Sequence, residues 1–211
     1  LAVGRLLTGR LSQRLSAPIA TFLGTLLFMS ALGLLQSVPI ISGIVPLLAA
    51  ATAIAARLDA SAVRAGDEAS WVGVQLDGDG HWTLEPLDTD LYNGLPGVAL
   101  FLAHLGALSG EARWTTLAQA AVAAWLRLSA EARADGPDAL APLGLFDGLG
   151  GQLYVLAQLI PLWGGADALR REVDALVEQA ALALDEAAED EAPGVARGLA
   201  GLLVGLLACA S

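Results

Sequence analysis

Apolar residues recur at helical spacing over most of the chain. The stretch 88–106, "DTDLYNGLPGVALFLAHLG", places on one helical face the residues Val98, Phe101, Leu102 and Leu105. The Asn-Gly-Leu-Pro-Gly segment before them would suit a hairpin turn, but no alternating strands flank it. The glycines therefore stand at or just inside the start of a helix.

The same pattern returns twice further along the chain. The segments "GLPGVALFL" (94–102), "GLGGQLYVL" (148–156) and "GLAGLLVGL" (198–206) share G-L-x-G-x-x-x-x-L, at spacings of 54 and 50 residues. The glycines of this structural repeat motif are Gly94, Gly97, Gly148, Gly151, Gly198 and Gly201. Amphipathic stretches, roughly 111–131 and 167–188, lie between them. A period near 50 with two helices per unit predicts an αα array.

The two kinds of helix predict two layers. A helix that is apolar all round must be enclosed, so the glycine-started helices form an inner layer. The amphipathic helices form an outer layer, and 167–188 carries a polar face made by Arg170, Arg171, Asp174, Glu178 and Asp185. The chain supplies two full units and the start of a third. This predicts a partial ring whose open, apolar edge would bind a peptide or associate with a second half.

One segment departs from the helical pattern. In "SWVGVQLDGDGHWTLEPLDTD" (70–90), apolar and other residues alternate before the turn signal Asp-Gly-Asp-Gly. A short β excursion near 70–86 is therefore expected in an otherwise all-α chain. The acidic turn itself lacks the further oxygen ligands of a calcium loop.

The stretch 17–56 carries no charge. Residues 19–38 are long enough to cross a bilayer, whereas 40–56 is marginal, because about 20 apolar residues are needed. Arginines on both flanks would suit a membrane hairpin with both ends in the cytoplasm. A pair of core helices from a larger parent protein is the alternative. We favour a soluble or artefactual segment over a membrane-bound one. We assign 1–44 as an apolar helical segment separate from a domain over 45–211.

Composition narrows the function further. Residues 1–57 hold four Arg and no acid, whereas the remainder holds seven Arg and 22 acids, and the chain has net charge −11. An acidic body is a poor phosphate binder, so nucleic acid is not an expected partner. The single cysteine, Cys209, excludes an internal disulfide. The first residue is not Met and the chain ends inside an apolar helical pattern, so we expect both ends to be cut.

Three segments resemble a known family: "SWVGVQL" (70–76), "DLYNGLPGVALFLAHLGALSGE" (90–111) and "GLFDGLGGQLYVLAQLIPLW" (144–163). In order and spacing they are similar to the cyclase domain of class II lanthipeptide synthetases, of the lanthionine synthetase C-like family, over roughly 45–211. The resemblance implies an α/α toroid of seven inner and seven outer helices, of which two to three pairs are present here. It also implies addition of a peptide cysteine thiol to dehydroalanine or dehydrobutyrine. Zinc would bind that thiol and lower its pKa.

The chain departs from the family at the metal ligands. The family uses two Cys and one His from Cys-containing and Cys-His-Gly segments, and no Cys-His pair occurs here. His81 and His104 do not match those motifs, so we expect no zinc and no catalytic residue in this chain. The family also places an Asp four residues before the first Gly of the third motif, where this chain has Gly194. Acid–base support from that position is therefore expected to be missing.

Other polar and aromatic residues have structural interpretations. Asn93 or Asp90 is expected to cap the helix that begins at the first motif, with Pro96 in its first turn. Asp147 is expected to cap the next helix, with a role in an active site as the alternative. We expect Cys209 to be a buried small hydrophobe. His104 is expected in the core or facing the pore. Packing at the core or a groove edge accounts for Trp71, Trp82, Trp114, Trp125 and Trp163.

The sequence thus predicts part of a peptide cyclase. The parent would be a cytoplasmic zinc enzyme acting on a precursor peptide, with ATP used by a dehydratase domain, and the part itself would be inactive. Two alternatives of other classes remain: a non-catalytic half-toroid that binds a peptide or self-associates, and a helical protein anchored at the cytoplasmic face of a membrane through 19–56.

Overall fold

The computed structural model describes residues 39–76, 80–134, 142–164, 167–186 and 194–210. The chain divides into two units between Ala56 and Arg57. The candidate span 19–38 lies outside the described residues. Within the described part of the chain, no helix is both long and apolar enough to cross a membrane.

The first described helix is α3, Pro39–Ser61. It ends at Ser61, after which the chain turns into a β-hairpin. In this hairpin β1 (Val63–Ala65) pairs antiparallel with β2 (Glu68–Ser70). Gly66, with φ of 63°, occupies the turn and adopts the left-handed conformation that a tight hairpin needs. Trp71 then donates its Nε1–H to the Leu58 carbonyl at 2.8 Å.

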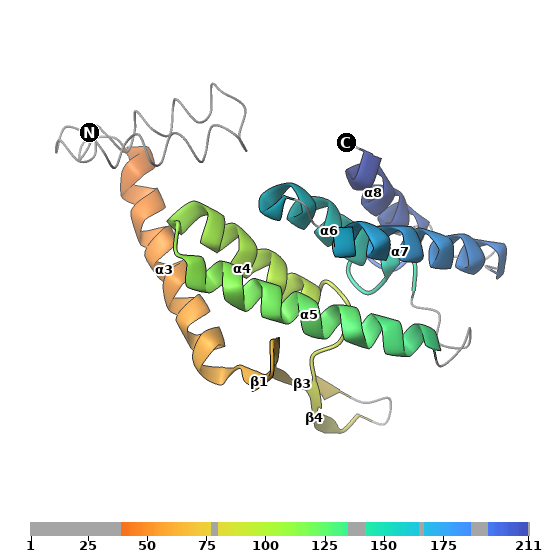
Figure 1. Ribbon diagram of the computed structural model, residues 1–211, viewed down its shortest axis with the longest axis horizontal. Coiled ribbons are helices and arrows are strands. Elements are labelled where there is room, and N and C mark those ends of the chain that lie inside the picture. Colours follow the sequence, from red (N-terminus) through yellow and green to blue (C-terminus); the bar gives the residue numbers. More distant parts are fainter. Residues whose placement is uncertain (1–38, 77–79, 135–141, 165–166, 187–193, 211) are drawn as a thin grey trace. The chain divides into compact units, whose positions relative to one another are not determined.

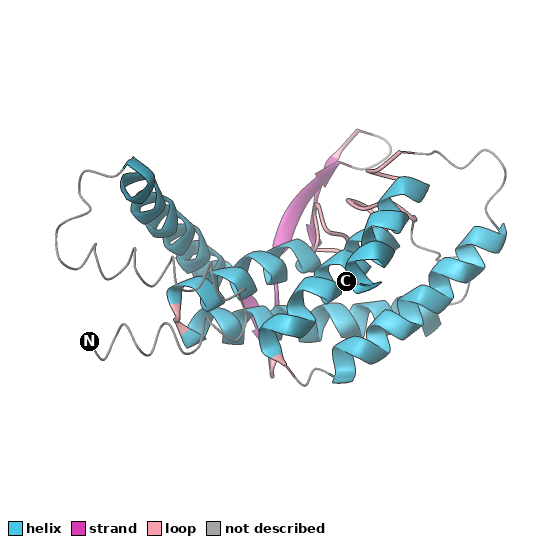
Figure 2. Ribbon diagram, turned by 90° about the horizontal axis from the view of Figure 1, so that it is seen from above, coloured by secondary structure: helices cyan, strands magenta, loops and turns pink. Residues whose placement is uncertain are grey.

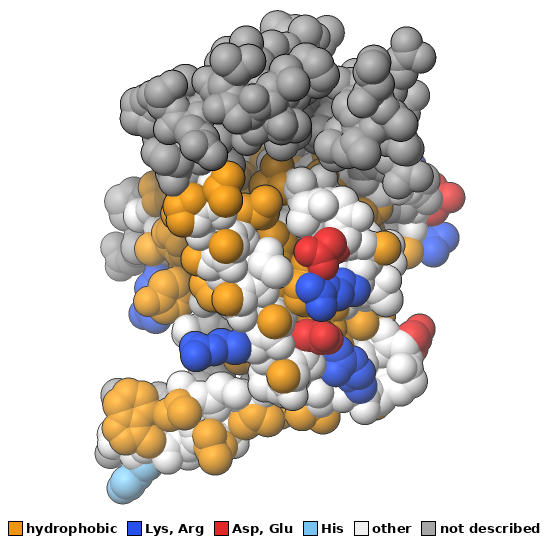
Figure 3. Space-filling model, turned by 90° about the vertical axis from the view of Figure 1, so that its left-hand side faces the viewer, with side chains coloured by type: hydrophobic (Ala, Val, Ile, Leu, Met, Phe, Trp, Pro, Cys, Tyr) orange, Lys and Arg blue, Asp and Glu red, His pale blue; other side chains and the backbone are white. Residues whose placement is uncertain are grey.

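A second hairpin forms the expected β excursion. β3 (Val72–Leu76) pairs antiparallel with β4 (Trp82–Pro86), with Val74 opposite Leu84. Alternation puts the apolar residues of both strands on one face, and that face is open: Trp82 is 72% and Leu84 75% exposed. Figure 3 shows hydrophobic side chains gathered on this hairpin, at the bottom of the view. Trp82 therefore lies outside the core.

Among the described residues of the second unit, five helices follow the hairpins (Figures 1 and 2). They are α4 (Leu95–Ser109), α5 (Ala112–Ala134), α6 (Leu149–Trp163), α7 (Asp167–Glu186) and α8 (Leu199–Ala210). The three glycine-started helices lie in a row, α4 against α6 and α6 against α8. The amphipathic helices cover them, α5 on α4 and α7 on α6. This inner and outer alternation is that of part of an α/α toroid.

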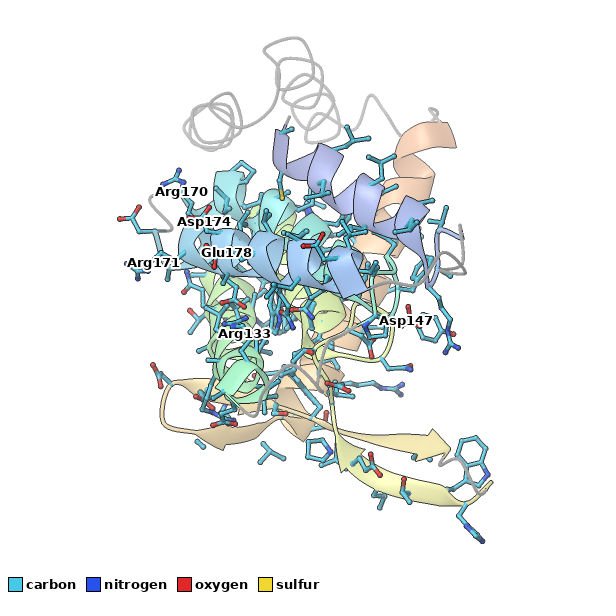
Figure 4. The ribbon with its side chains drawn as sticks, turned by 90° about the vertical axis from the view of Figure 1, so that its right-hand side faces the viewer. Arg133, Asp147, Arg170, Arg171, Asp174 and Glu178 are labelled. Atoms are coloured by element: carbon cyan, nitrogen blue, oxygen red, sulfur yellow. The ribbon has the colours of Figure 1, made fainter. Side chains whose placement is uncertain are left out.

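The core lies between the two layers. Trp114 and Trp125 of α5 are fully buried, as are Leu102 of α4 and Leu153 and Leu156 of α6. Four charged residues of α7 are exposed on the outer side of that helix, namely Arg170, Arg171, Asp174 and Glu178, which Figure 4 labels. Glu172 of the same helix is buried. Gly110, with φ of 73°, ends α4 by donating its N–H to Gly106 O at 3.0 Å. The left-handed turn at this residue lets α5 fold back directly onto α4.

Candidate functional site

The repeat glycines lie at equivalent places before and inside three helix starts. Gly94, Gly148 and Gly198 directly precede α4, α6 and α8. In each motif the second glycine lies in the first helical turn, against the carbonyl oxygen of the residue six positions earlier. A Cβ on Gly97, Gly151 or Gly201 would lie 2.4, 2.0 or 2.2 Å from that oxygen, which belongs to Leu91, Leu145 or Val195 respectively. Only a residue without a side chain fits at this distance.

Backbone hydrogen bonds join the three loops that precede these helices. Tyr92 N–H donates to Phe146 O at 3.0 Å, and Phe146 N–H donates to Ala196 O at 3.1 Å. These three residues occupy the same position, two before the first glycine of each motif. The Tyr92 and Phe146 rings also meet edge to face, with their centroids 6.2 Å apart. Each loop therefore holds the next one in the same register.

Two glycines outside the motif bring α6 and α8 together. A Cβ on Gly150 would lie 2.4 Å from Gly201 O, and one on Gly205 would lie 2.3 Å from Gly150 O. Neither Gly150 nor Gly205 is predicted from the repeat motif. The signals that could have found them are the Gly-Gly pair at 150–151 and the four-residue spacing between Gly201 and Gly205, which puts both on one helical face.

The expected side-chain caps are wrong. Gly94 and Gly148 occupy the N-cap positions of α4 and α6, and neither helix has a side-chain cap hydrogen bond. Asp90 Oδ1 instead accepts the N–H of Asn93 at 2.6 Å, inside the loop. Asp147 Oδ2 pairs with Nε of Arg197 at 2.7 Å. Loop carbonyl groups pack against the cap position, so only glycine fits there. Asp90 and Asp147 therefore interact with groups other than the helix N-terminus. Pro96 does lie in the first turn of α4.

A polar cavity of about 330 Å³ lies beside the first two of these loops. The polar lining comes from three places. The loops contribute Asp88, Asp90 and Asp147, α5 contributes Ser129 and Arg133, and α6 contributes Gln152. α7 completes the wall. Figure 4 labels Arg133 and Asp147, which come from α5 and from the loop before α6.

Three carboxyl groups and one guanidinium line the cavity, from Asp88, Asp90, Asp147 and Arg133. Burial raises the pKa of the Asp90 carboxyl, and the nearby Asp88 and Asp147 carboxylates raise it further, against hydrogen bonds from the Asn93 and Tyr92 backbone that lower it. Arg133 is engaged by Glu172, with Nη1–Oε1 and Nη2–Oε2 distances of 2.7 and 2.9 Å. The cavity therefore favours positive charge.

The two other residue types considered as ligands lie elsewhere. Cys209 is exposed near the end of α8, so the expectation that it is buried is wrong; its Sγ lies 3.6 Å from Leu153 O. His104 lies half-buried on α4, and burial lowers the pKa of its imidazole. His81 is exposed just before β4. Within the described ranges, no group of three or more His, Cys, Asp or Glu is placed to hold a metal ion.

A comparison with family models decides the relationship. The model described as "Lanthionine synthetase C-like protein" matches residues 85–211. The chain belongs to the lanthionine synthetase C-like family. No curated protein gives a significant match to it.

The matched residues include all three glycine motifs of this lanthionine synthetase C-like chain and its helices α4 to α8. The match begins in β4, so the domain start at residue 45 stays a prediction. The zinc that the resemblance implies requires Cys and His ligands, and the described residues do not fit it, because they bring no such group together.

Proposed function

We propose that this chain forms part of a lanthipeptide synthetase cyclase domain. The parent domain would join a peptide cysteine to dehydroalanine or dehydrobutyrine through a thioether bond. The observation that carries the proposal is the stacking of three glycine loops in one register, through the Tyr92, Phe146 and Ala196 backbone. Such loops set inner helices side by side, and the family match covers all three.

The chain itself is proposed not to activate the thiol. A thiolate nucleophile at neutral pH needs a metal or a neighbouring cation to lower the pKa of its thiol. The chain has one cysteine and two histidines, and the described residues assemble no metal-binding group. Precursor peptide as substrate, zinc in the parent and a cytoplasmic setting belong to the same proposal.

The test supplies a dehydrated peptide with one cysteine and measures its remaining free thiol. Intramolecular addition leaves the mass unchanged, so thiol alkylation followed by mass spectrometry is the readout. We expect the thiol to disappear no faster with the chain and zinc than with zinc alone. Zinc-dependent thiol loss that grows with chain concentration would overturn the proposed inactivity.

A second candidate is a non-catalytic module that associates through its inner helices. Leu199, Leu203 and Leu207 form one stripe on α8 and are 38, 56 and 61% exposed. Replacing Leu203 and Leu207 by Gln should convert a concentration-dependent oligomer into a monomer, as measured by light scattering after gel filtration. A wild-type chain that is monomeric at all concentrations would exclude this candidate.

A further inference from the structure

The cavity between α5, α6, α7 and the first two glycine loops has an excess of negative charge. Two of its charged groups are neutralised by ion pairs, Arg133 with Glu172 and Asp147 with Arg197. Among the described residues, no cation pairs with Asp88 or Asp90. Asp88 Oδ1 accepts the N–H of Thr89, and Asp90 Oδ1 accepts that of Asn93, each at 2.6 Å. Each carboxylate therefore keeps acceptor capacity for a further donor.

Two nearly buried polar side chains also line the cavity. Ser129 is 6% exposed, and its Oγ has no hydrogen-bond partner within the described part of the chain. Gln152 is 3% exposed and accepts the Trp125 Nε1–H through Oε1 at 3.3 Å. Buried polar groups are usually satisfied, so the unpartnered Ser129 hydroxyl at this cavity points to a bound molecule.

From these observations we infer that the cavity binds an organic monocation, the guanidinium or ammonium head of a basic side chain. Asp88 and Asp90 compensate its charge, and Gln179 of α7 supplies a further amide oxygen. A volume of about 330 Å³ accommodates such a head group with its alkyl stem. The described carboxylates do not converge closely enough to hold a metal ion. The inference stands on the cavity and does not depend on the proposed cyclase relationship.

The charges around Asp90 define how binding depends on pH. Asp88 and Asp147 face it as carboxylates, and the cavity arginine, Arg133, is held by Glu172. Because burial raises the pKa of Asp90, its carboxylate is lost earlier than usual as the pH falls. Affinity for a cation is expected to fall with it, whereas a contact made only by apolar groups would not respond.

The experiment titrates the full chain with Nα-acetyl-arginine amide and Nα-acetyl-lysine amide by calorimetry. The citrulline amide, which is nearly isosteric with arginine and uncharged, is the ligand control. We expect saturable 1:1 binding of at least one cation, and none of the citrulline amide. Asp90→Asn should weaken binding about tenfold, because an ionised acceptor is lost while the Asn93 N–H keeps an oxygen partner.

Asp174→Asn is the matched protein control, because Asp174 is exposed on the outer side of α7. It should leave the affinity unchanged, and circular dichroism should show both variants folded. Absence of saturable binding by either cation would overturn the inference. So would equal binding of the citrulline amide, or an affinity that Asp90→Asn does not reduce.

Discussion

At the residue scale, the second glycine of each motif is defined by a distance to backbone. Carbonyl oxygens of the preceding loop approach within 2.0 to 2.4 Å of where a Cβ would be on Gly97, Gly151 and Gly201. A backbone atom cannot rotate away as a flexible side chain can. Substitution at these positions must therefore move a loop or a helix.

Gly151→Ala is expected to lower the free energy of unfolding by about 3 kcal/mol, because its methyl group would overlap Leu145 O and contact Leu91 Cβ. Better helix propensity offsets only about 1 kcal/mol of this loss. Urea unfolding followed by circular dichroism measures the change. Gly194→Ala is the control, since nothing lies within 4 Å of that position, and it should change stability by less than about 0.5 kcal/mol. Equal effects of the two substitutions would contradict the steric explanation.

Asp90→Asn is expected to leave stability unchanged or to raise it near neutral pH. The pKa of Asp90 is raised by burial and by the Asp88 and Asp147 carboxylates, so the folded state binds its proton more readily than the unfolded state. The stabilising contribution of the protonated acid is therefore present at low pH and lost as the pH rises through the raised pKa. Any advantage of the variant should shrink as the pH falls towards about 4. Urea unfolding across this range measures it, and a variant less stable than wild type at neutral pH would refute the assignment.

At the element scale, one ion pair ties the end of α5 to α7. Arg133 and Glu172 form two parallel hydrogen bonds, and their side chains are 27 and 8% exposed. The exposed pair Arg170–Asp167, by contrast, joins two residues of the same helix at 57 and 81% exposure. The first pair fixes the spacing of two outer helices, and the second does not.

Arg133→Met is expected to lower the free energy of unfolding by about 2–4 kcal/mol, because it leaves the Glu172 carboxylate buried without its partner. Replacing both residues by Met should recover most of that loss, since no unpaired charge then remains. Arg170→Met, the control, should cost less than about 1 kcal/mol. Thermal and urea unfolding of the four proteins measure these values. A double variant no more stable than the single one would show that the pair contributes through packing rather than through charge.

The sequence anticipated the elements better than the site. Helical spacing and the repeated G-L-x-G identified three inner helices and two outer ones, because a 3.6-residue pattern is local. The cavity brings together Asp88, Ser129 and Gln152, which the chain separates by more than 20 residues each. The predicted caps were wrong for a related reason. Asp90 and Asp147 are residues that commonly cap helices, but their loops fold so that glycine alone fits the cap position.

At the scale of the whole molecule, charge is distributed unevenly along the chain. Residues 58–211 carry a net charge of −15 and form almost all of the second unit, whereas 1–57 carry +4. Ion pairs such as Arg127 with Glu68 and Glu131 use several of the seven arginines of that segment. The segment has 22 acids against seven arginines, so mutual repulsion of the excess carboxylates opposes the folded state.

Raising the sodium chloride concentration to about 0.5 M should therefore raise the unfolding midpoint by roughly 2–4 °C at neutral pH, which corresponds to about 1 kcal/mol. The increase should disappear near pH 4.4, the isoelectric point, where the net charge vanishes. Differential scanning calorimetry at both pH values measures it. A midpoint that falls with salt at neutral pH would mean that attractive ion pairs outweigh the repulsion.

The sequence by itself determined the helical periodicity, the repeat of about 50 residues, the hairpin near 70–86 and the family, because each depends on the order of residue types along the chain. Only the tertiary structure decided which side chains meet. It showed Gly150 against Gly201, Asp147 paired with Arg197, Cys209 exposed and an acidic cavity behind the first two loops. These contacts depend on how loops and helices far apart in sequence pack, and no local pattern specifies that packing.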